Sequence, residues 1–301
     1  MAYQTGTFTS LADLHTTITN FCVANGWAST SGILSKAGVH VKLDSTSSAD
    51  YLLTKIGTGD DGLGALTNAG SSFNTSAVYV LKNFISTITF PATYHLISLG
   101  SPDAIFLIIN YNVTDCQHLA FGNCLKYGNW VGGQFLSATA GANSSSLNPL
   151  QEYSRVNNNA GYNTLGGSGA FLYSAYDNYQ GPARSSSLFN ADFDGVGWRA
   201  NVDGNAVTLS ETFGAAALAA PFLKTLNPIN LQPTMGPCLF VVGRPAGFSS
   251  IVGSMPHIRY LRVDNYQPGD VISVGSQKWI VFPHRNVTNH NGGWAIKYDG
   301  P

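Results

Sequence analysis

Charged residues are unusually rare in this 301-residue sequence. They make up 10% of it, where a soluble domain ordinarily has about 25%. The net charge is −1, and the sequence contains no basic stripe, which argues against binding nucleic acid by neutralising phosphates. The polar residues are mainly Ser, Thr, Asn and 33 Gly. This composition favours a β-rich protein whose surface is partly covered by neighbouring molecules.

Long apolar runs, targeting signals and closely spaced cysteines are also lacking. No apolar run approaches the roughly 18 residues that would span a membrane. The first residues, MAYQTGTFTS, have neither the basic start nor the apolar core of a secretory signal. Cys22, Cys116, Cys124 and Cys238 form no CxxC pair, so we expect free thiols in a reducing compartment. The chain is therefore expected to be made in a cytoplasm and not exported by a signal-dependent route.

Catalytic motifs are absent too. There are two Glu and fourteen Asp, and most Asp lie beside Gly, Pro or Asn, where turns need them. No HExxH or G-x-S-x-G occurs, and the GGSG at 166–169 has no P-loop lysine. His284 and His290 are explained as loop residues, and Asp192 with Asp194 as part of a hairpin turn instead of a calcium loop. The sequence thus predicts no enzyme, no cofactor and no metal site, with a glycan-cleaving enzyme the least favoured alternative.

One helix is clearly predicted, between Ser10 and Asn25. Ser10 is a suitable N-cap with Asp13 three residues on, and Gly26 is a natural residue to follow the C-terminus. Five apolar residues fall on one face at spacings of three and four: Leu11, Leu14, Ile18, Phe21 and Cys22.

Most of the remaining chain predicts short strands. The alternation at Val39, Val41 and Leu43 follows turn candidates at Gly32 and Gly38.

Further along, residues 75–88 suit a helix or a strand equally. Residues 93–100 and 104–114 predict two strands joined by Ser-Pro-Asp, the second apolar on both faces and therefore central. Residues 215–228 suit a short helix or an edge strand, and from 237 to the end consecutive short strands are expected.

Residues 143–180 differ from the rest of the chain. Asn, Ser, Gly and Tyr dominate and periodicity fades, which suits either a surface loop or an adaptable contact region. Two Asp-Gly pairs follow, Asp194-Gly195 and Asp203-Gly204, and both predict hairpin turns.

The predicted fold class is mostly β (α+β). An N-terminal helix packed on a β-hairpin occupies residues 1–57. A central β-rich body occupies 58–236 and carries the loop insertion at about 143–180, and a small C-terminal β-unit occupies 237–301.

Three stretches resemble a family of tailed-bacteriophage virion structural proteins. The first is MAYQTGTFTSLADLHTTITNFCVANGW, the second is DCQHLAFGNCLKYGNWVGGQFLSA, and the third is the end of the chain, PGDVISVGSQKWIVFPHRNV with GGWAIKYDGP. In the second stretch KYGNW stands where the family usually has a proline-rich turn. The matching residues in the first two stretches are Gly6, Leu11, Leu14, Ile18, Phe21, Gly26, Trp27, Gly122, Tyr127 and Gly132.

The resemblance implies a structural role in the tail, neck/collar or baseplate of a virion. It implies that the chain assembles in the cytoplasm of a bacterial host. The expected partners are copies of the chain and neighbouring virion proteins, and the expected state is a symmetric homo-oligomer. The alternative is a receptor- or glycan-binding virion module, favoured by the 12% aromatic residues.

Candidate assembly contacts are aromatic residues of the Tyr-rich region and of the last strand. We expect that last strand, Trp294 to Tyr298, to be held in a sheet or against a neighbour. The candidates are Tyr153, Tyr162, Tyr173, Tyr176, Tyr179, Trp294 and Tyr298.

Overall fold

The structure is a computed structural model in which most of the chain is described. The described residues are 1–46, 52–70, 78–80, 89–110, 116–138, 186–193, 195, 197–200, 213–216, 227–229, 232–244, 248–263, 265–283 and 292–300. They form one helix and a series of antiparallel strands, so the fold is mostly β as predicted. The predicted insertion at 143–180 lies outside the described residues.

The elements follow one another in three groups along the chain. The N-terminal group is β1 (Ala2–Phe8), α1 (Leu11–Ala24), β2 (Ala28–Thr30), β3 (Ile33–Lys36), β4 (Val39–Asp44), β5 (Leu52–Asp60), β6 (Leu66–Ala69) and β7 (Val78–Val80). The central group is β8 (Ala92–Leu99), β9 (Ala104–Asn110), β10 (Cys116–Asn123), β11 (Leu125–Lys126), β12 (Val131–Ala138), β13 (Ser186–Asp192) and β14 (Trp198–Ala200). The C-terminal group is β15 (Phe213–Ala216), β16 (Gly236–Arg244), β17 (Phe248–Arg262), β18 (Asp270–Val274), β19 (Gln277–Pro283) and β20 (Gly292–Tyr298).

A central sheet, here called the middle sheet, has the strand order β1-β8-β9-β10-β12-β13-β14. Its strand β9 is buried on both faces. Phe106 and Ile108 pack into one core, while Leu107 and Ile109 pack into a second core on the opposite face. Because successive side chains of a strand point to opposite faces, the continuous apolar run of β9 places this sheet between two other layers. The prediction of a central strand at 104–114 is confirmed for residues 104–110.

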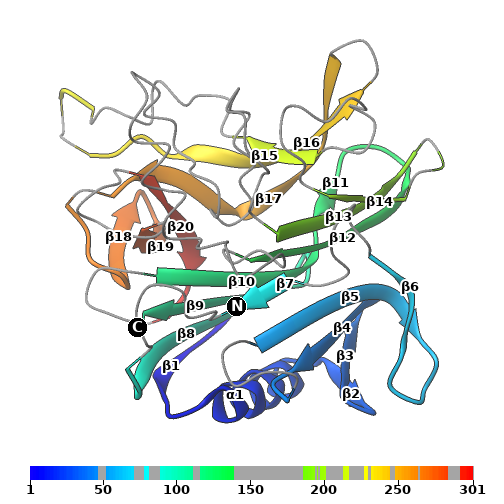
Figure 1. Ribbon diagram of the computed structural model, residues 1–301. Coiled ribbons are helices and arrows are strands. Elements are labelled where there is room, and N and C mark those ends of the chain that lie inside the picture. The colour runs from blue at the N-terminus through cyan, green and yellow to red at the C-terminus, as the bar shows by residue number, and fades with distance from the viewer. Residues whose placement is uncertain are drawn as a thin grey trace, which may run out of the picture.

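The first covering layer is the C-terminal sheet, with the order β15-β16-β17-β20-β19-β18 and β11 paired to β17. It packs on the middle sheet above β10 in Figure 1. The rings of Phe189 and Phe240 stack across this interface with centroids 4.6 Å apart, and Phe135 lies 5.6 Å from Phe240. Each such buried aromatic or aliphatic side chain contributes about 1.5–3 kcal/mol to folding.

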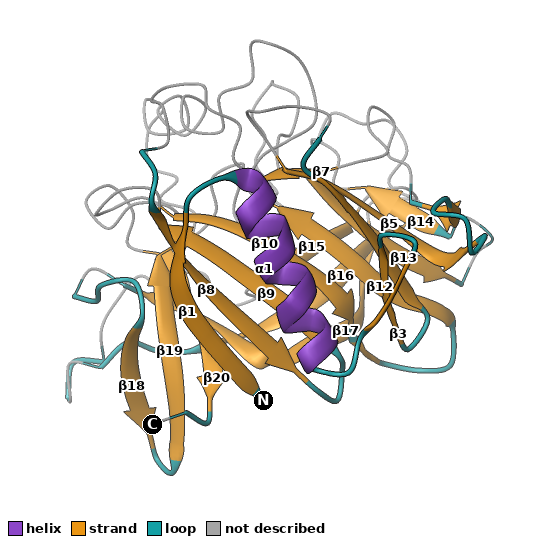
Figure 2. Cartoon of the chain, turned by 90° about the horizontal axis from the view of Figure 1, so that it is seen from below, coloured by secondary structure: helices purple, strands orange, loops and turns teal. Residues whose placement is uncertain are grey.

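The second covering layer combines α1 with the N-terminal sheet, β2-β3-β4-β5-β6, in which β7 also pairs with β5. Figure 2 shows α1 lying across β8, β9 and β10. All five residues predicted for the apolar face of the helix are buried in the same core as Leu107 and Ile109.

Both predicted ends of the helix are present. The Asp13 N–H donates to Ser10 Oγ at 3.1 Å. At the other end, Gly26 N–H donates to Val23 O and Trp27 N–H donates to Cys22 O, the two hydrogen bonds of a Schellman motif. The motif turns Trp27 inward, and its ring meets Phe121 of β10 edge to face.

The layers also meet at the ends of their strands. Lys36 of β3 pairs with Asp103, in the turn between β8 and β9, at 2.9 Å, and Asn123 Nδ2 donates to Ala37 O. The boundary predicted after residue 57 falls inside β5, and β1 pairs with β8 along its whole length. The boundary predicted after residue 236 falls at the first residue of β16. The described parts on either side of these boundaries therefore share sheets.

Several further predicted strands and turns fall within the described residues. Residues 78–80 form β7, a strand, inside the region where helix and strand were equally favoured. The predicted strands before and after residue 100 form the β8–β9 hairpin. Residues 215 and 216 end β15, which is at the edge of its sheet among the residues that the structure describes. Gly195 N–H donates to Asp192 Oδ1 in the turn between β13 and β14, as the Asp-Gly pair predicted, whereas Asp203-Gly204 lies outside the described residues.

Gly132, one of the residues that carry the family resemblance, sits where no side chain fits. Its φ is 112°, and a Cβ there would overlap the carbonyl oxygen of Asn190 on the paired strand β13. Gly195 offers a matched comparison, since its φ is 85° but nothing lies within 4 Å of a Cβ.

We therefore expect Gly132→Ala to lower the free energy of unfolding by at least about 3 kcal/mol, because it adds a steric clash to backbone strain. Gly195→Ala should cost about 1 kcal/mol, the strain alone. Denaturant unfolding of both variants measures the difference. Equal costs would show that β12 and β13 can move apart at this point.

Candidate functional site

The predicted assembly contacts fall into two groups. Tyr153, Tyr162, Tyr173, Tyr176 and Tyr179 lie outside the described residues. Trp294 and Tyr298 lie on β20, which pairs with β17 on one side and β19 on the other, so the last strand is held in a sheet as expected.

The side chains of Trp294 and Tyr298 are 1% and 6% exposed and belong to the core between the two larger sheets. They point inward because β20 is a central strand of a sheet that is covered on this face. Any surface that this part of the chain presents to a neighbour must therefore come from other side chains.

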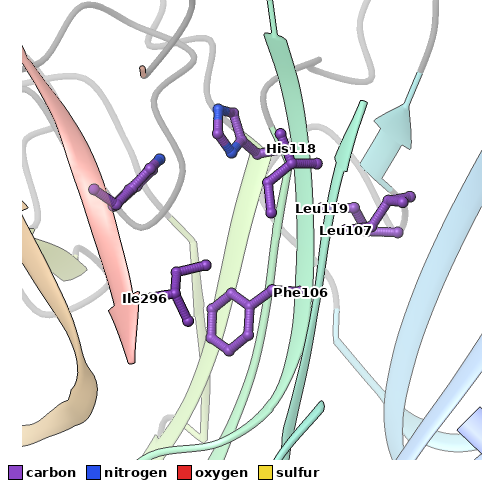
Figure 3. A pocket seen from close by; sticks show the side chains of 7 residues that line it. Phe106, Leu107, His118, Leu119 and Ile296 are labelled. Atoms are coloured by element: carbon purple, nitrogen blue, oxygen red, sulfur yellow. The ribbon is translucent and has the colours of Figure 1, made fainter. Parts of the chain in front are cut away.

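A narrow gap lies beside Trp294, between β9 and β10 on one side and β20 on the other. Figure 3 shows Phe106, His118 and Ile296 among the side chains around it. The gap is too small to hold a water molecule. Its histidine is engaged, since His118 Nε2 lies 3.0 Å from the carbonyl oxygen of Pro283 and the ring packs against Trp294. The gap is a feature of packing between the sheets and offers no room for a ligand.

The thiols and histidines are dispersed in the described part of the chain. All four cysteines are buried and none forms a disulfide bond, as expected, and burial raises the pKa of Cys22, Cys124 and Cys238 to about 12. Among the described residues no group of three or more His, Cys, Asp or Glu is placed to hold a metal ion. His284 and His290 lie outside the described residues.

His95 occupies the seam between the start and the end of the chain. Its Nδ1 lies 2.8 Å from the hydroxyl of Tyr3 on β1, and its ring meets Phe282 of β19 edge to face. Tyr3 in turn meets Tyr298 edge to face, with centroids 5.3 Å apart. Gly269 lies against the His95 ring, so closely that a Cβ at this position would be 3.2 Å from His95 Cε1. Burial lowers the pKa of His95 from its ordinary 6.5 to about 4, so the ring is neutral at pH 7.

The strand β18 forms an open edge of the C-terminal sheet. It pairs only with β19 among the described residues. Val271 lies opposite Ile280 and so points toward the same face, yet Val271 is 45% exposed while Ile280 is 1% exposed. The middle sheet therefore covers β19 but leaves β18 open. Ser273 and Lys278 form the next pair on this same face, and both are exposed.

A second exposed region surrounds the turn between β11 and β12. Leu125, Tyr127 and Val131 are exposed there. Trp130 is only partly exposed because Phe189 meets its ring edge to face and the Lys126 ammonium lies 5.3 Å from the ring centroid. Its ring is thus already engaged by the chain, which disfavours stacking on a sugar at this point.

The tip of the β5–β6 hairpin, residues 60–65, displays a single leucine. Leu63 is 88% exposed. Sequence reasoning placed neither this tip nor the β18 edge among the candidate contacts. The signal for the tip was the run Asp-Asp-Gly-Leu-Gly, whose turn residues enclose one large apolar side chain. The signal for β18 was an apolar strand, but its position at an edge depends on strand order, which the sequence does not give.

No helix in the described part of the chain has the length and apolar character needed to cross a membrane.

Protonation of His95 should destabilise the seam. Its pKa is lower in the folded protein than in the unfolded chain, so the unfolded chain binds more protons as the pH falls from 6.5 toward 4. We expect this group to remove up to about 3 kcal/mol of the unfolding free energy across that window and nothing above it.

His95→Asn should flatten the dependence of stability on pH between 7 and 4. Chemical denaturation of both proteins at each pH measures the slopes, and other titrating groups, such as the half-buried His15, are common to both proteins and cancel in the comparison. Parallel curves would mean that the pKa of His95 is the same in the folded protein and in the unfolded chain.

No protein-family model matches this chain, and no curated protein gives a significant match. The virion resemblance therefore depends on the residues of the three stretches alone. In the structure these stretches form β1 with α1, the strands β10 to β12, and the strands β18 to β20.

Proposed function

We propose that this chain is a structural component of a tailed-phage virion that acts by protein–protein assembly in the tail, neck/collar or baseplate. It has no catalytic role in this proposal. Its partners are copies of itself and neighbouring virion proteins, and it assembles in the cytoplasm of the bacterial host into a symmetric homo-oligomer.

One observation carries the proposal, namely the open edge at β18. Val271 and Val274 are each nearly half exposed on a strand that has a free side among the described residues. Native proteins usually protect such edges with Lys, Pro or a covering segment, because an exposed apolar edge pairs readily with another chain. The strand itself, DVISV, contains no Lys or Pro. An edge of this kind is suited to being covered by a neighbouring subunit.

The positions of the resembling stretches add support. Within the first stretch, Leu14, Ile18 and Phe21 fill the core beneath the middle sheet. The third stretch provides the open edge itself together with β19 and β20. The resemblance thus concerns both the framework and the part of the surface that is suited to assembly.

The alternative, a receptor- or glycan-binding virion module, ranks second. Its main support was aromatic content, but Trp279, Trp294 and Tyr260 are buried, and Trp130 is engaged by Phe189 and Lys126. The Tyr-rich residues on which it also depends lie outside the described residues.

Mass spectrometry of purified phage particles tests the proposal. We expect peptides of this chain in particles purified on a density gradient from a lysate of the infected host, in a fixed ratio to other virion proteins. The same measurement on the particle-free fraction is the control. Peptides confined to that fraction would overturn the proposal, and specific binding of the purified chain on a glycan array would instead favour the alternative.

A further inference from the structure

The hydrogen bonds of the β5–β6 tip hold it in one shape. Asp61 Oδ1 accepts from the N–H groups of both Leu63 and Ala65, and Asp61 N–H donates to Ala65 O. Gly62 N–H donates to Asp60 Oδ1. The backbone of the tip is therefore bonded internally, and its shape does not depend on a partner.

Neighbouring strands fix the same tip from outside. Ser31 Oγ donates to Gly62 O at 3.0 Å, and Lys42 Nζ donates to Gly64 O at 2.6 Å. His40 Nδ1 lies 2.7 Å from Asp60 Oδ2. A segment with this many bonds loses little conformational entropy when it binds, so a side chain displayed on it is a preorganised anchor. That side chain is Leu63, at 88% exposed.

The anchor carries a negative charge beside it. Hydrogen bonds from the N–H groups of Ala65 and Leu63 lower the pKa of Asp61, so its carboxylate is ionised at neutral pH. Lys42 and His40 are turned toward Gly64 and Asp60 within the hairpins. A partner surface must therefore offer an apolar patch and a cation.

The β18 edge of the same chain has this chemistry. Val271 supplies an exposed apolar side chain, and Lys278 is the charged residue of the β18–β19 pair on that face. In Figure 1 the β18 edge lies at the left of the molecule and the β5–β6 hairpin at the right, and β18 and β5 lie at the same two sides in Figure 2. The two surfaces therefore cannot meet within one molecule.

We propose that the β5–β6 tip of one copy docks on the β18 edge of a second copy, with Leu63 against Val271 and Asp61 near Lys278. The contact joins two different patches, so it is head to tail and produces a ring where the rotation closes. This inference rests on the proposed assembly function and names its partner as a second copy of this chain.

Photo-cross-linking tests the geometry of the contact. We expect p-benzoylphenylalanine at position 63 to cross-link to residues 271–278 of another molecule, and mixing ¹⁵N-labelled with unlabelled chain distinguishes cross-links between molecules. The matched control is the same group at Val23, an apolar side chain of α1 that is 48% exposed and should give no such product. Products that join two tips, or that map elsewhere, would overturn the proposal.

A charge cycle tests the chemistry of the contact. Lys278→Glu should weaken self-association roughly tenfold in sedimentation equilibrium, because two carboxylates would then face each other. Asp61→Asn keeps an oxygen for the tip hydrogen bonds and should restore most of that loss when combined with Lys278→Glu. Lys297→Glu is the control, since Lys297 pairs with Trp279 on the opposite face of the sheet and should leave association unchanged. Strictly additive effects of the first two changes would reject a direct contact.

Leu63→Ala should weaken association by roughly thirtyfold, the effect of removing a central apolar anchor. Its melting temperature should stay at the wild-type value because the side chain is exposed. The two proposals fail separately. A chain found in particles without the 63-to-271 cross-link would leave virion function standing, whereas a cross-linked chain absent from particles would leave only the head-to-tail contact.

Discussion

The middle sheet is apolar on both faces, and the rest of the fold depends on covering both of them. A strand such as β9, with Phe106 and Ile108 on one side and Leu107 and Ile109 on the other, is stable only when both sides are removed from water. The C-terminal sheet covers one side, and α1 with the N-terminal sheet covers the other. This requirement also explains why Trp294 and Tyr298 point inward, because β20 faces the middle sheet across the core that lies between the middle sheet and the C-terminal sheet.

The two covering layers bury the interior of the fold fully but leave parts of its edges exposed to solvent. Across the interior, β16, β17 and β20 have a strand on each side. At β18 the cover from the middle sheet ends, and Val271 stays half open while its partner Ile280 is buried. At the far side of the molecule the β5–β6 hairpin extends past the core, so that its tip carries Leu63 into solvent. Both surfaces that are proposed for assembly thus lie where one layer extends beyond the layer it covers.

Sequence reasoning succeeded where the signal is local. The face of α1, its Ser10 cap and the Gly26 termination depend on spacings of three or four residues, and each was predicted. The turn at Gly195 was predicted for the same reason. The position of β1 beside β8, some ninety positions along the chain, was not, because strand order depends on long-range packing. The burial of Trp294 and Tyr298 could not be read from the sequence for the same reason, since an aromatic residue looks alike whether its strand is central, as β20 is, or at an edge, as β18 is.

The Tyr3–His95–Phe282 seam connects these layers to the edge that is proposed for assembly. It joins β1, β8 and β19, and the turn that closes over the His95 ring, at Gly269, leads directly into β18. The turn that precedes the open edge thus lies against a neutral, buried imidazole that is packed between the first and last parts of the chain. In the proposed assembly, a neighbour docked on β18 would favour the same arrangement of this turn, so the docked contact and the seam are expected to stabilise each other. The proposed contact would therefore raise the free energy of unfolding of the copy that is docked.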